Sequence, residues 1–188
     1  MKFIICVCLS IFLSFSSNIV AQNLIPPPSG WSNISSNRGS FNFHMPVASA
    51  TFQKDTLGVL FYHNEIDTIL GLQTHYIDGV STVTTDSVWQ VLLAQNNSDT
   101  LRAFAGLCII FTNGQLSSIQ DLNPTALNPK GVEFSITMPE QESVSEVMFT
   151  RIYYHNGRFF AFTANGVQSD INRLNNYKNN LFNSISIY

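Results

Sequence analysis

The stretch RIYYHNGRFFAF, residues 151–162, decides the fold of this 188-residue chain. Its Asn156-Gly157 pair is the strongest short sequence signal for a β-hairpin with a two-residue turn. Aromatic and β-branched residues, which favour strands, stand on both sides of the pair. The stretch therefore predicts two antiparallel strands that are joined at Asn156 and Gly157.

Pairing the two strands about this turn puts apolar side chains on both faces of the hairpin. The expected pairs are His155–Arg158, Tyr153–Phe160 and Arg151–Phe162 on one face, and Tyr154–Phe159 and Ile152–Ala161 on the other. A sheet with one solvated face would place polar residues on that face. We therefore expect helices or loops to cover much of both faces.

The more polar face of the hairpin supplies the candidate binding residues, which are Arg151, Tyr153, His155 and Arg158. Arginines beside aromatic rings can hold an anionic or flat ligand through charge-assisted hydrogen bonds and stacking. The structural alternative is that Arg151 lies over Phe162 as a cation–π pair and reaches an acid on a covering helix. Only the residues of this face that stay uncovered are expected to meet a ligand.

The first 21 residues have the pattern of a secretory signal peptide. Lys2 gives a basic start, residues 3–15 are apolar, and Ile19-Val20-Ala21 precedes a possible cleavage point. The apolar run is shorter than the roughly 20 residues of a membrane-spanning helix. We therefore expect residues 1–21 to be removed and the mature protein to be secreted or periplasmic, with no stable membrane span.

The mature chain is expected to consist of a linker and one domain. Residues 22–30, QNLIPPPSG, form the linker because three consecutive prolines favour an extended polyproline segment. Residues 31–188 are long enough for a single α+β domain with its own core. Cys108 is the only cysteine of that domain and stands in the apolar context GLCIIF, which favours a buried side chain over a nucleophile.

Hydrophobic periodicity predicts the remaining elements of the domain. Strands are expected at residues 31–46 (two, around a turn at 37–39), 58–65, 69–77, 116–122, 132–138, 147–155, 158–163 and within 182–188. Helices are expected within residues 84–95, 98–112 and 169–182. This order predicts an α+β fold, a mainly antiparallel sheet with helices packed on its faces.

The helix at residues 98–112 carries signals at both ends. Ser98-Asp99 provides a cap at its start, and Asn113-Gly114 is typical of a helix end. Its apolar stripe is expected to consist of Leu101, Phe104, Ala105, Cys108 and Phe111. The short segment LCIIF is by itself also compatible with a strand.

Composition and motifs argue against several classes of function. Charged residues are only 11% of the chain and its net charge is −3, whereas nucleic-acid binding requires a basic face. The sequence contains no GxSxG, CxxC, GxxxxGK[ST] or GxGxxG motif. The four histidines lack the i, i+4 spacing of a helical zinc site, so each is expected on a strand surface, and an incidental metal site near His63 and His75 is the alternative. We expect no catalytic residues, no cofactor and no metal.

The two ends of the domain resemble the PsbP-like fold group. WSNISSNRGSFNFHMP (31–46) resembles its opening, in which Trp precedes a short F-x-F/V-x-x-P strand. RIYYHNGRFFAFTANG (151–166) with LFNSISI (181–187) resembles its close, an aromatic hairpin followed by a helix and a short final strand. The resemblance implies a PsbP-like α-β-α sandwich and a role as an accessory or binding protein; residues 51–128 do not align.

The sequence thus favours an exported, non-catalytic accessory or binding protein. Its partner would be an envelope or extracellular protein or a small ligand. A secreted hydrolase is the first alternative, and it predicts a deep pocket where two or more of His63, His75, His155 and nearby acids converge. A small-molecule carrier is the second alternative, and it predicts an enclosed apolar cavity beneath the sheet.

Overall fold

The computed structural model of the chain describes residues 26–36, 40–46, 52–56, 59–67, 70–78, 87–139 and 144–188. Its strands are β1 (Trp31–Ser36), β2 (Phe41–Pro46), β3 (Phe52–Thr56), β4 (Val59–Asp67), β5 (Leu70–Asp78), β6 (Gln115–Leu122), β7 (Gly131–Thr137), β8 (Glu146–His155), β9 (Arg158–Val167) and β10 (Ser186–Ile187). Its helices are α2 (Ser87–Gln95), α3 (Thr100–Thr112), the 3-10 turn η2 (Gln168–Asp170) and α4 (Ile171–Asn183). The expected signal peptide and the turn at 37–39 lie outside these residues.

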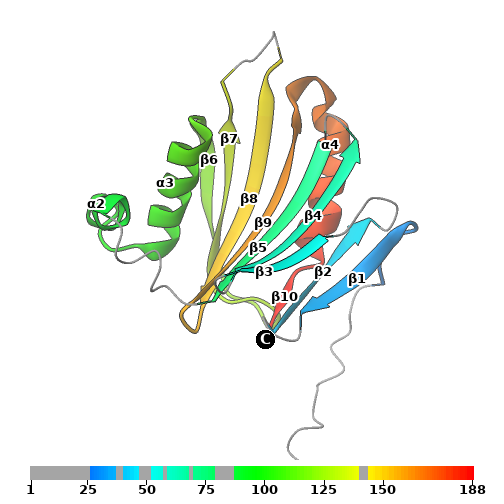
Figure 1. Ribbon diagram of the computed structural model, residues 1–188, viewed down its shortest axis with the longest axis horizontal. Coiled ribbons are helices and arrows are strands. Elements are labelled where there is room, and N and C mark those ends of the chain that lie inside the picture. The colour runs from blue at the N-terminus through cyan, green and yellow to red at the C-terminus, as the bar shows by residue number, and fades with distance from the viewer. Residues whose placement is uncertain are drawn as a thin grey trace, which may run out of the picture.

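The strands form two antiparallel sheets. The large sheet has seven strands in the order β3-β4-β5-β9-β8-β7-β6, and the small sheet has three in the order β1-β2-β10. Figure 1 shows α2 and α3 on one side of the large sheet, and α4 with the small sheet on the other. The predicted α+β fold, a mainly antiparallel sheet with helices on its faces, is therefore confirmed, and it has the layers of an α-β-α sandwich.

The β8–β9 hairpin has the predicted register. Tyr153 is opposite Phe160, and His155 is opposite Arg158. Asn156 (φ 50°) and Gly157 (φ 77°) both have positive φ. A two-residue turn of type I′ needs positive φ at both central positions, and Asn-Gly is the pair that adopts it most readily.

The first core lies between the large sheet, the small sheet and α4. Phe41 and Phe43 of β2 meet the large sheet edge-to-face, with ring centroids 5.6 Å apart for Phe41–Phe160 and 5.6 Å apart for Phe43–Phe162. All four rings are at most 2% exposed. Such edge-to-face pairs stabilise beyond the area that they bury, so this aromatic cluster joins the two sheets.

The second core lies on the opposite face, under α2 and α3. Phe159 contacts Trp89 of α2 (centroids 5.9 Å apart) and Phe104 of α3 (4.6 Å). Because successive strand residues point to opposite faces, the neighbours Phe159 and Phe160 belong to different cores. The expectation that both faces of the hairpin are covered is thus confirmed.

Helix α3 begins and ends where its capping residues predict. The Asp99 carboxylate accepts hydrogen bonds from the backbone N–H groups of Leu101 (3.0 Å) and Arg102 (3.1 Å). Asn113 at the other end is left-handed, with φ 51°, which is the conformation that often terminates helices.

Three expectations about individual residues were wrong. Phe111 is 79% exposed and does not belong to the buried stripe of α3. His44 is 3% exposed, because β2 is the central strand of the small sheet and all six of its residues are buried. Phe182 and Asn183 lie in α4, since Leu174, Leu181 and Phe182 continue its buried face at helical spacing.

Candidate functional site

Arg151 is held by three groups of the protein. Its Nε donates to Glu133 Oε2 at 2.6 Å, and its Nη1 donates to the carbonyl oxygen of Phe182 at 3.0 Å. Its guanidinium also lies 4.8 Å from the centroid of the Phe182 ring. Arg151 therefore makes the two expected kinds of structural contact, an ion pair and a cation–π contact, but with different partners. The acid is Glu133 on the neighbouring strand β7 and not on a covering helix, and the ring is Phe182 of α4 and not Phe162.

Tyr153 lies next to Arg151 on the same face and is 3% exposed. Its ring occupies space left by Gly131, where an added Cβ would lie 2.6 Å from Tyr153 Cδ1 and 2.6 Å from the Ile152 carbonyl oxygen. Burial raises the pKa of the Tyr153 hydroxyl, and the nearby Arg151 charge only partly opposes this effect. Tyr153 is therefore a neutral phenol at physiological pH.

The two residues line one pocket of ≈ 250 Å³ at the end of strands β6 and β8. The rest of its lining comes from Gln120, Asp121, Leu122, Asn123, Thr125 and Asn128. Gly131 of β7 is paired with Leu122 on one side and with Tyr153 on the other. A residue without a side chain between them leaves room for the Tyr153 ring beside the pocket.

The loop at residues 123–130 forms part of the pocket lining, and it is held by hydrogen bonds within the loop and by one bond to Ile185. Thr125 Oγ1 accepts from the backbone N–H groups of Leu127 (3.2 Å) and Asn128 (3.0 Å). Asn128 Nδ2 donates to the Ile185 carbonyl oxygen at 2.9 Å, whereas its Oδ1 is buried without a hydrogen-bond partner. Buried polar atoms are nearly always paired, and this acceptor is one of the exceptions among the described residues.

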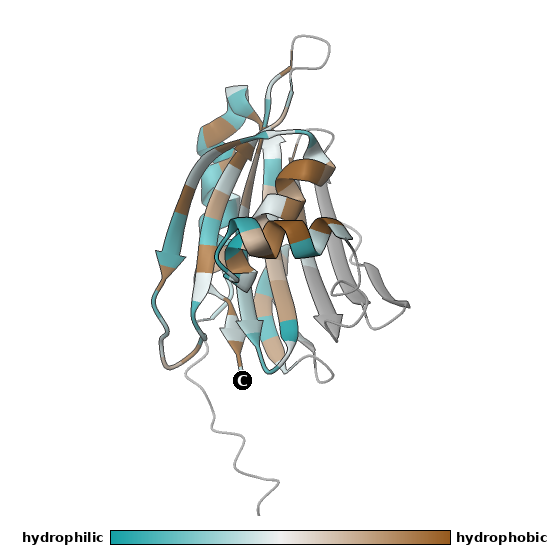
Figure 2. Cartoon of the chain, turned by 90° about the vertical axis from the view of Figure 1, so that its left-hand side faces the viewer, coloured by the Kyte–Doolittle hydropathy of each residue, from teal (hydrophilic) through white to brown (hydrophobic). Residues whose placement is uncertain are grey.

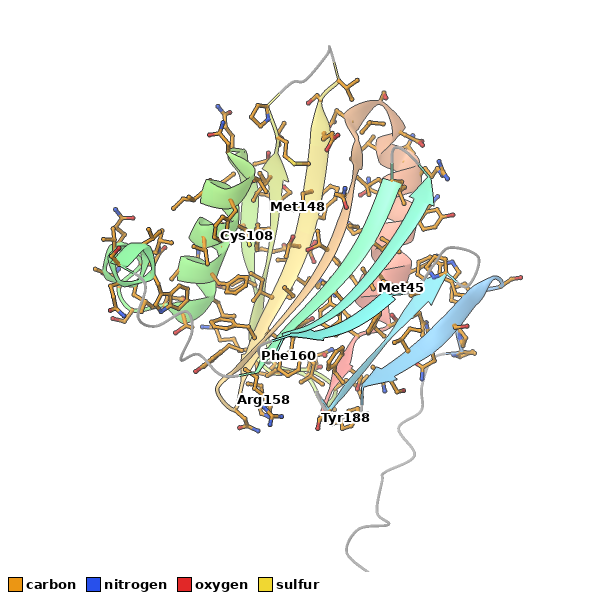
Figure 3. The ribbon with its side chains drawn as sticks, viewed as in Figure 1. Met45, Cys108, Met148, Arg158, Phe160 and Tyr188 are labelled. Carbon is orange, nitrogen blue, oxygen red and sulfur yellow. The ribbon has the colours of Figure 1, made fainter. Side chains whose placement is uncertain are left out.

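His155 and Arg158 lie farther along the hairpin, at its turn. They are opposite each other in the register, and both are half-buried. Figure 3 shows Arg158 at the same end of the molecule as Tyr188. The four candidate binding residues therefore divide into two pairs, with Arg151 and Tyr153 in the pocket and His155 with Arg158 at the turn.

The structure describes only some of the side chains that the sequence suggested for metal or thiol chemistry. Among the residues that the structure describes, no three His, Cys, Asp or Glu side chains are grouped so that they could hold a metal ion. The side chains of His63 and His75 lie outside that part of the chain. Burial raises the pKa of the Cys108 thiol to about 12, so Cys108 is a neutral thiol at physiological pH. Its side chain packs against the second core but is half-buried, and not fully buried as its apolar context predicted.

The sequence reading missed the pocket residues of β6 and the 123–130 loop. The available signal was local: two Asn-Pro pairs, Asn123-Pro124 and Asn128-Pro129, stand between two predicted strands. No local sequence pattern predicts the hydrogen bond from Asn128 to Ile185, which lies 57 positions later in the chain. That contact holds the loop against the final strand and so forms the pocket.

Within the described part of the chain, no helix is both long and apolar enough to cross a membrane. No protein-family model matches the sequence, and no curated protein matches it.

Solved structures, by contrast, do resemble the chain. The solution structure of cyanobacterial PsbP (CyanoP) from Synechocystis sp. PCC 6803 has a TM-score of 0.54 and 9% identity, over 86% of this chain and 94% of that chain. A Bacteroides thetaiotaomicron structure has a TM-score of 0.44 and 11% identity over 83% of this chain and 48% of its own. LpqN of Mycobacterium tuberculosis, involved in cell envelope biogenesis, has a TM-score of 0.41 and 10% identity over 86% of this chain and 80% of that chain.

The likeness to the cyanobacterial protein covers 86% of this chain, which is far more than the two end motifs that the sequence alone aligned. At 9% sequence identity, the likeness to the cyanobacterial protein establishes the fold of the chain and nothing about its function. It agrees with the motifs at both ends of the domain, namely the Trp31 strand pair and the aromatic hairpin. The chain therefore has a PsbP-like fold.

Proposed function

We propose that the chain is an exported, non-catalytic binding protein of the accessory type, which holds a small hydroxyl- or amide-bearing group in the pocket between β6, β8 and the 123–130 loop. One observation carries the proposal. Two residues selected from the sequence as ligand contacts, Arg151 and Tyr153, line the same pocket as six residues from β6 and the loop.

The chemistry of the lining favours a neutral polar ligand. Gln120, Asn123 and Asn128 offer amide donors and acceptors, and Thr125 offers a hydroxyl group. The Arg151 charge is already paired with Glu133, so the pocket has no unpaired arginine charge that would require an anion.

The size of the pocket limits the ligand. Its ≈ 250 Å³ lies just below the roughly 300–1,000 Å³ of pockets that hold drug-sized molecules. It would accommodate one sugar ring or the end of one peptide, as a free ligand or as part of an envelope partner. An exported protein would meet both kinds of group.

The charged and phenolic groups of the pocket are suited to binding rather than to proton transfer. Burial raises the pKa of the Tyr153 hydroxyl, which keeps its proton near neutral pH. The Asp121 carboxylate is paired with Arg102 at 3.0 Å. A general acid or base needs a pKa near the working pH, so the protonated Tyr153 hydroxyl favours the binding role over the hydrolase alternative. Export itself is proposed from the N-terminal sequence pattern alone.

The proposal is tested by titrating the mature chain with three probes and following its side-chain amides by NMR. The probes are glucose for hydroxyl groups, N-acetylglycinamide for amide groups, and N-acetylglucosamine for both. We expect the amide signals of Gln120, Asn123 and Asn128 to shift with at least one probe. Signals that move only outside this pocket, or with none of the probes, would contradict the proposal.

A matched pair of glutamine substitutions provides the control. Gln120 and Gln115 are both exposed residues of β6, but only Gln120 lines the pocket. Gln120→Ala removes one hydrogen-bonding group, which should weaken binding about five-fold if the bond contributes about 1 kcal/mol. Gln115→Ala should leave the affinity unchanged. Equal effects of the two substitutions on the affinity would exclude this pocket as the binding site.

A further inference from the structure

Strand β6 forms an open edge of the large sheet. Within the described part of the chain it pairs only with β7, and six of its eight residues are exposed. Figure 2 shows it as the outermost strand of the sheet, to the left of the helices. Among the described residues, the backbone hydrogen bonds outside the regular elements involve none of residues 115–122. Alternate residues of an antiparallel pair direct their N–H and C=O groups away from the partner strand, so β6 presents a row of unpaired donors and acceptors.

The two edges of the large sheet differ in their protection against another strand. Proteins protect sheet edges with short strands, charged residues, prolines and bulges. The opposite edge, β3, has only five residues, FQKDT, of which two are charged. Strand β6 has eight residues, QLSSIQDL, without proline and with Asp121 as its one charged residue. A bulge lies between Leu116 and Ser118, so the regular part of this edge, which another strand can follow, is Ser118–Leu122.

The polar pocket between β6, β8 and the 123–130 loop borders this edge. Gln120 and Arg151, which both line it, are aligned across the sheet through Glu133 and therefore share a face. Asp121 also lines the pocket, although successive side chains of a strand point to opposite faces. Its carboxylate pairs with Arg102 of α3, on the other side of the sheet. The pocket therefore extends from one face of the sheet to strand β6 itself.

We propose that β6 binds an extended segment of a partner protein as an additional strand, and that an Asn or Gln side chain of this segment enters the polar pocket. This inference rests on the proposed function, and it specifies the ligand as an amide group that is carried by a peptide. In this mode of recognition, main-chain hydrogen bonds provide affinity that depends little on sequence, and a pocket for one side chain provides specificity.

The geometry of a sheet brings such a side chain to the pocket. An added strand would lie about 4.8 Å beyond β6, and its residue opposite Gln120 would point to the same face of the sheet as Gln120 does. That face carries the pocket. Amide side chains suit its lining, because Gln120, Asn123 and Asn128 offer complementary donors and acceptors.

A second copy of this chain is a less suitable occupant of the edge. Two β6 strands side by side would bring two Asp121 carboxylates, each 52% exposed, into one interface. Each chain also carries a net charge of −3, and like charges across an interface oppose association. A neutral or basic segment of a different protein avoids this repulsion.

Three pentapeptides, acetylated and amidated at their ends, test the proposal by NMR on the mature chain. The first is Thr-Val-Asn-Val-Thr, which combines residues that favour strands with a central amide side chain. The second has alanine in place of the asparagine. The third is the first peptide with methyl groups on the backbone nitrogens of its Asn and of the Val that follows. Because consecutive backbone N–H groups of a strand point to opposite edges, the third peptide cannot pair regularly with β6 through either edge.

We expect the first peptide to shift the backbone amide signals of Ser118–Leu122 together with the side-chain amide signals of Gln120 and Asn123. Alternate backbone amides of Ser118–Leu122 should also exchange with solvent more slowly when the peptide is bound. The alanine peptide and the methylated peptide should each bind at least about five-fold more weakly than the first, which is the effect of losing one hydrogen bond.

Equal affinities for the first peptide and the methylated peptide would overturn strand addition, and so would backbone signals of Ser118–Leu122 that none of the peptides shifts. Equal affinities for the asparagine and alanine peptides would overturn the placement of the amide side chain in the pocket. A shift of the same backbone signals on dilution of the free protein would assign the edge to a second copy, which also overturns the proposal. In each case a response of the pocket amides to N-acetylglycinamide would leave the proposed function standing, whereas its failure requires that they respond to no probe.

Discussion

Arg151 connects three parts of the fold through a single side chain. It pairs with Glu133 of β7, donates to the Phe182 carbonyl oxygen at the end of α4, and lies over the Phe182 ring. The Arg151 and Glu133 side chains are 22% and 14% exposed, so solvent screens their interaction less than it screens a surface pair. The role of Arg151 in stability is therefore separable from any contact with a ligand.

Replacing Arg151 with methionine should lower the free energy of unfolding by about 2–3 kcal/mol, because it leaves the largely buried Glu133 carboxylate without a cation. Urea unfolding with linear extrapolation measures the change. Arg173→Met is the control, since Arg173 and Asp170 are both 38% exposed and 3.5 Å apart. A surface pair contributes at most about 1 kcal/mol, so equal losses for the two variants would contradict the structural role of Arg151.

Single residues were predictable from the sequence where their neighbours in the chain determine their surroundings. The pairing of Tyr153 with Phe160 follows from a turn only a few residues away. The partners of Arg151 were not predictable in the same way, because Phe182 is 31 positions distant. His44 was misjudged for the same reason, since its burial depends on the strands that flank β2 in the small sheet.

At the scale of elements, α3 was predicted well because both of its ends carry local capping signals. Strand β3 was not predicted, since its sequence FQKDT has two charged residues and no apolar alternation. The final strand was placed too early, because Phe182 fits an alternating pattern as well as it fits the buried face of α4. Element boundaries are therefore reliable where a cap or turn residue fixes them, and less so where only periodicity is available.

The cap of α3 gives a direct test at this scale. Asp99→Ala removes the acceptor of two backbone hydrogen bonds, of 3.0 and 3.1 Å, and should cost about 1 kcal/mol of stability. Asp99→Asn keeps an acceptor oxygen and loses only the exposed ion pair with Arg102. It should therefore cost only a few tenths of the stability that Asp99→Ala costs. Thermal or urea unfolding of both variants measures the difference. Similar losses for alanine and asparagine would mean that the charge, and not the cap, stabilises α3.

At the scale of the whole molecule, the final described residues tie together segments from both ends of the domain. Ser186 and Ile187 pair with Asn42 and Phe41 of β2. The Ile187 N–H donates to the Leu127 carbonyl oxygen at 2.8 Å. The polar pocket, the small sheet and α4 therefore depend on one short strand, which no local sequence pattern would single out.

Removing residues 185–188 should destabilise the domain by several kcal/mol, because it removes the side chains of Ile185 and Ile187 from the core, and the burial of each contributes roughly 1.5–3 kcal/mol. The same deletion releases the Asn128 and Leu127 hydrogen bonds of the 123–130 loop. We therefore expect amide hydrogen exchange of that loop to accelerate more than exchange of the β8–β9 hairpin, which keeps its own ladder.

Deletion of Tyr188 alone is the matched control for this truncation. Tyr188 is 54% exposed, and its backbone N–H donates to the Ser40 carbonyl oxygen at 2.8 Å. Its loss should therefore cost about 1 kcal/mol at most and leave exchange in the 123–130 loop unchanged. If neither deletion accelerated exchange of the loop, the loop would be held by contacts other than those of the final strand. The pocket would then keep its shape without the final strand, and its dependence on a long-range contact would be refuted.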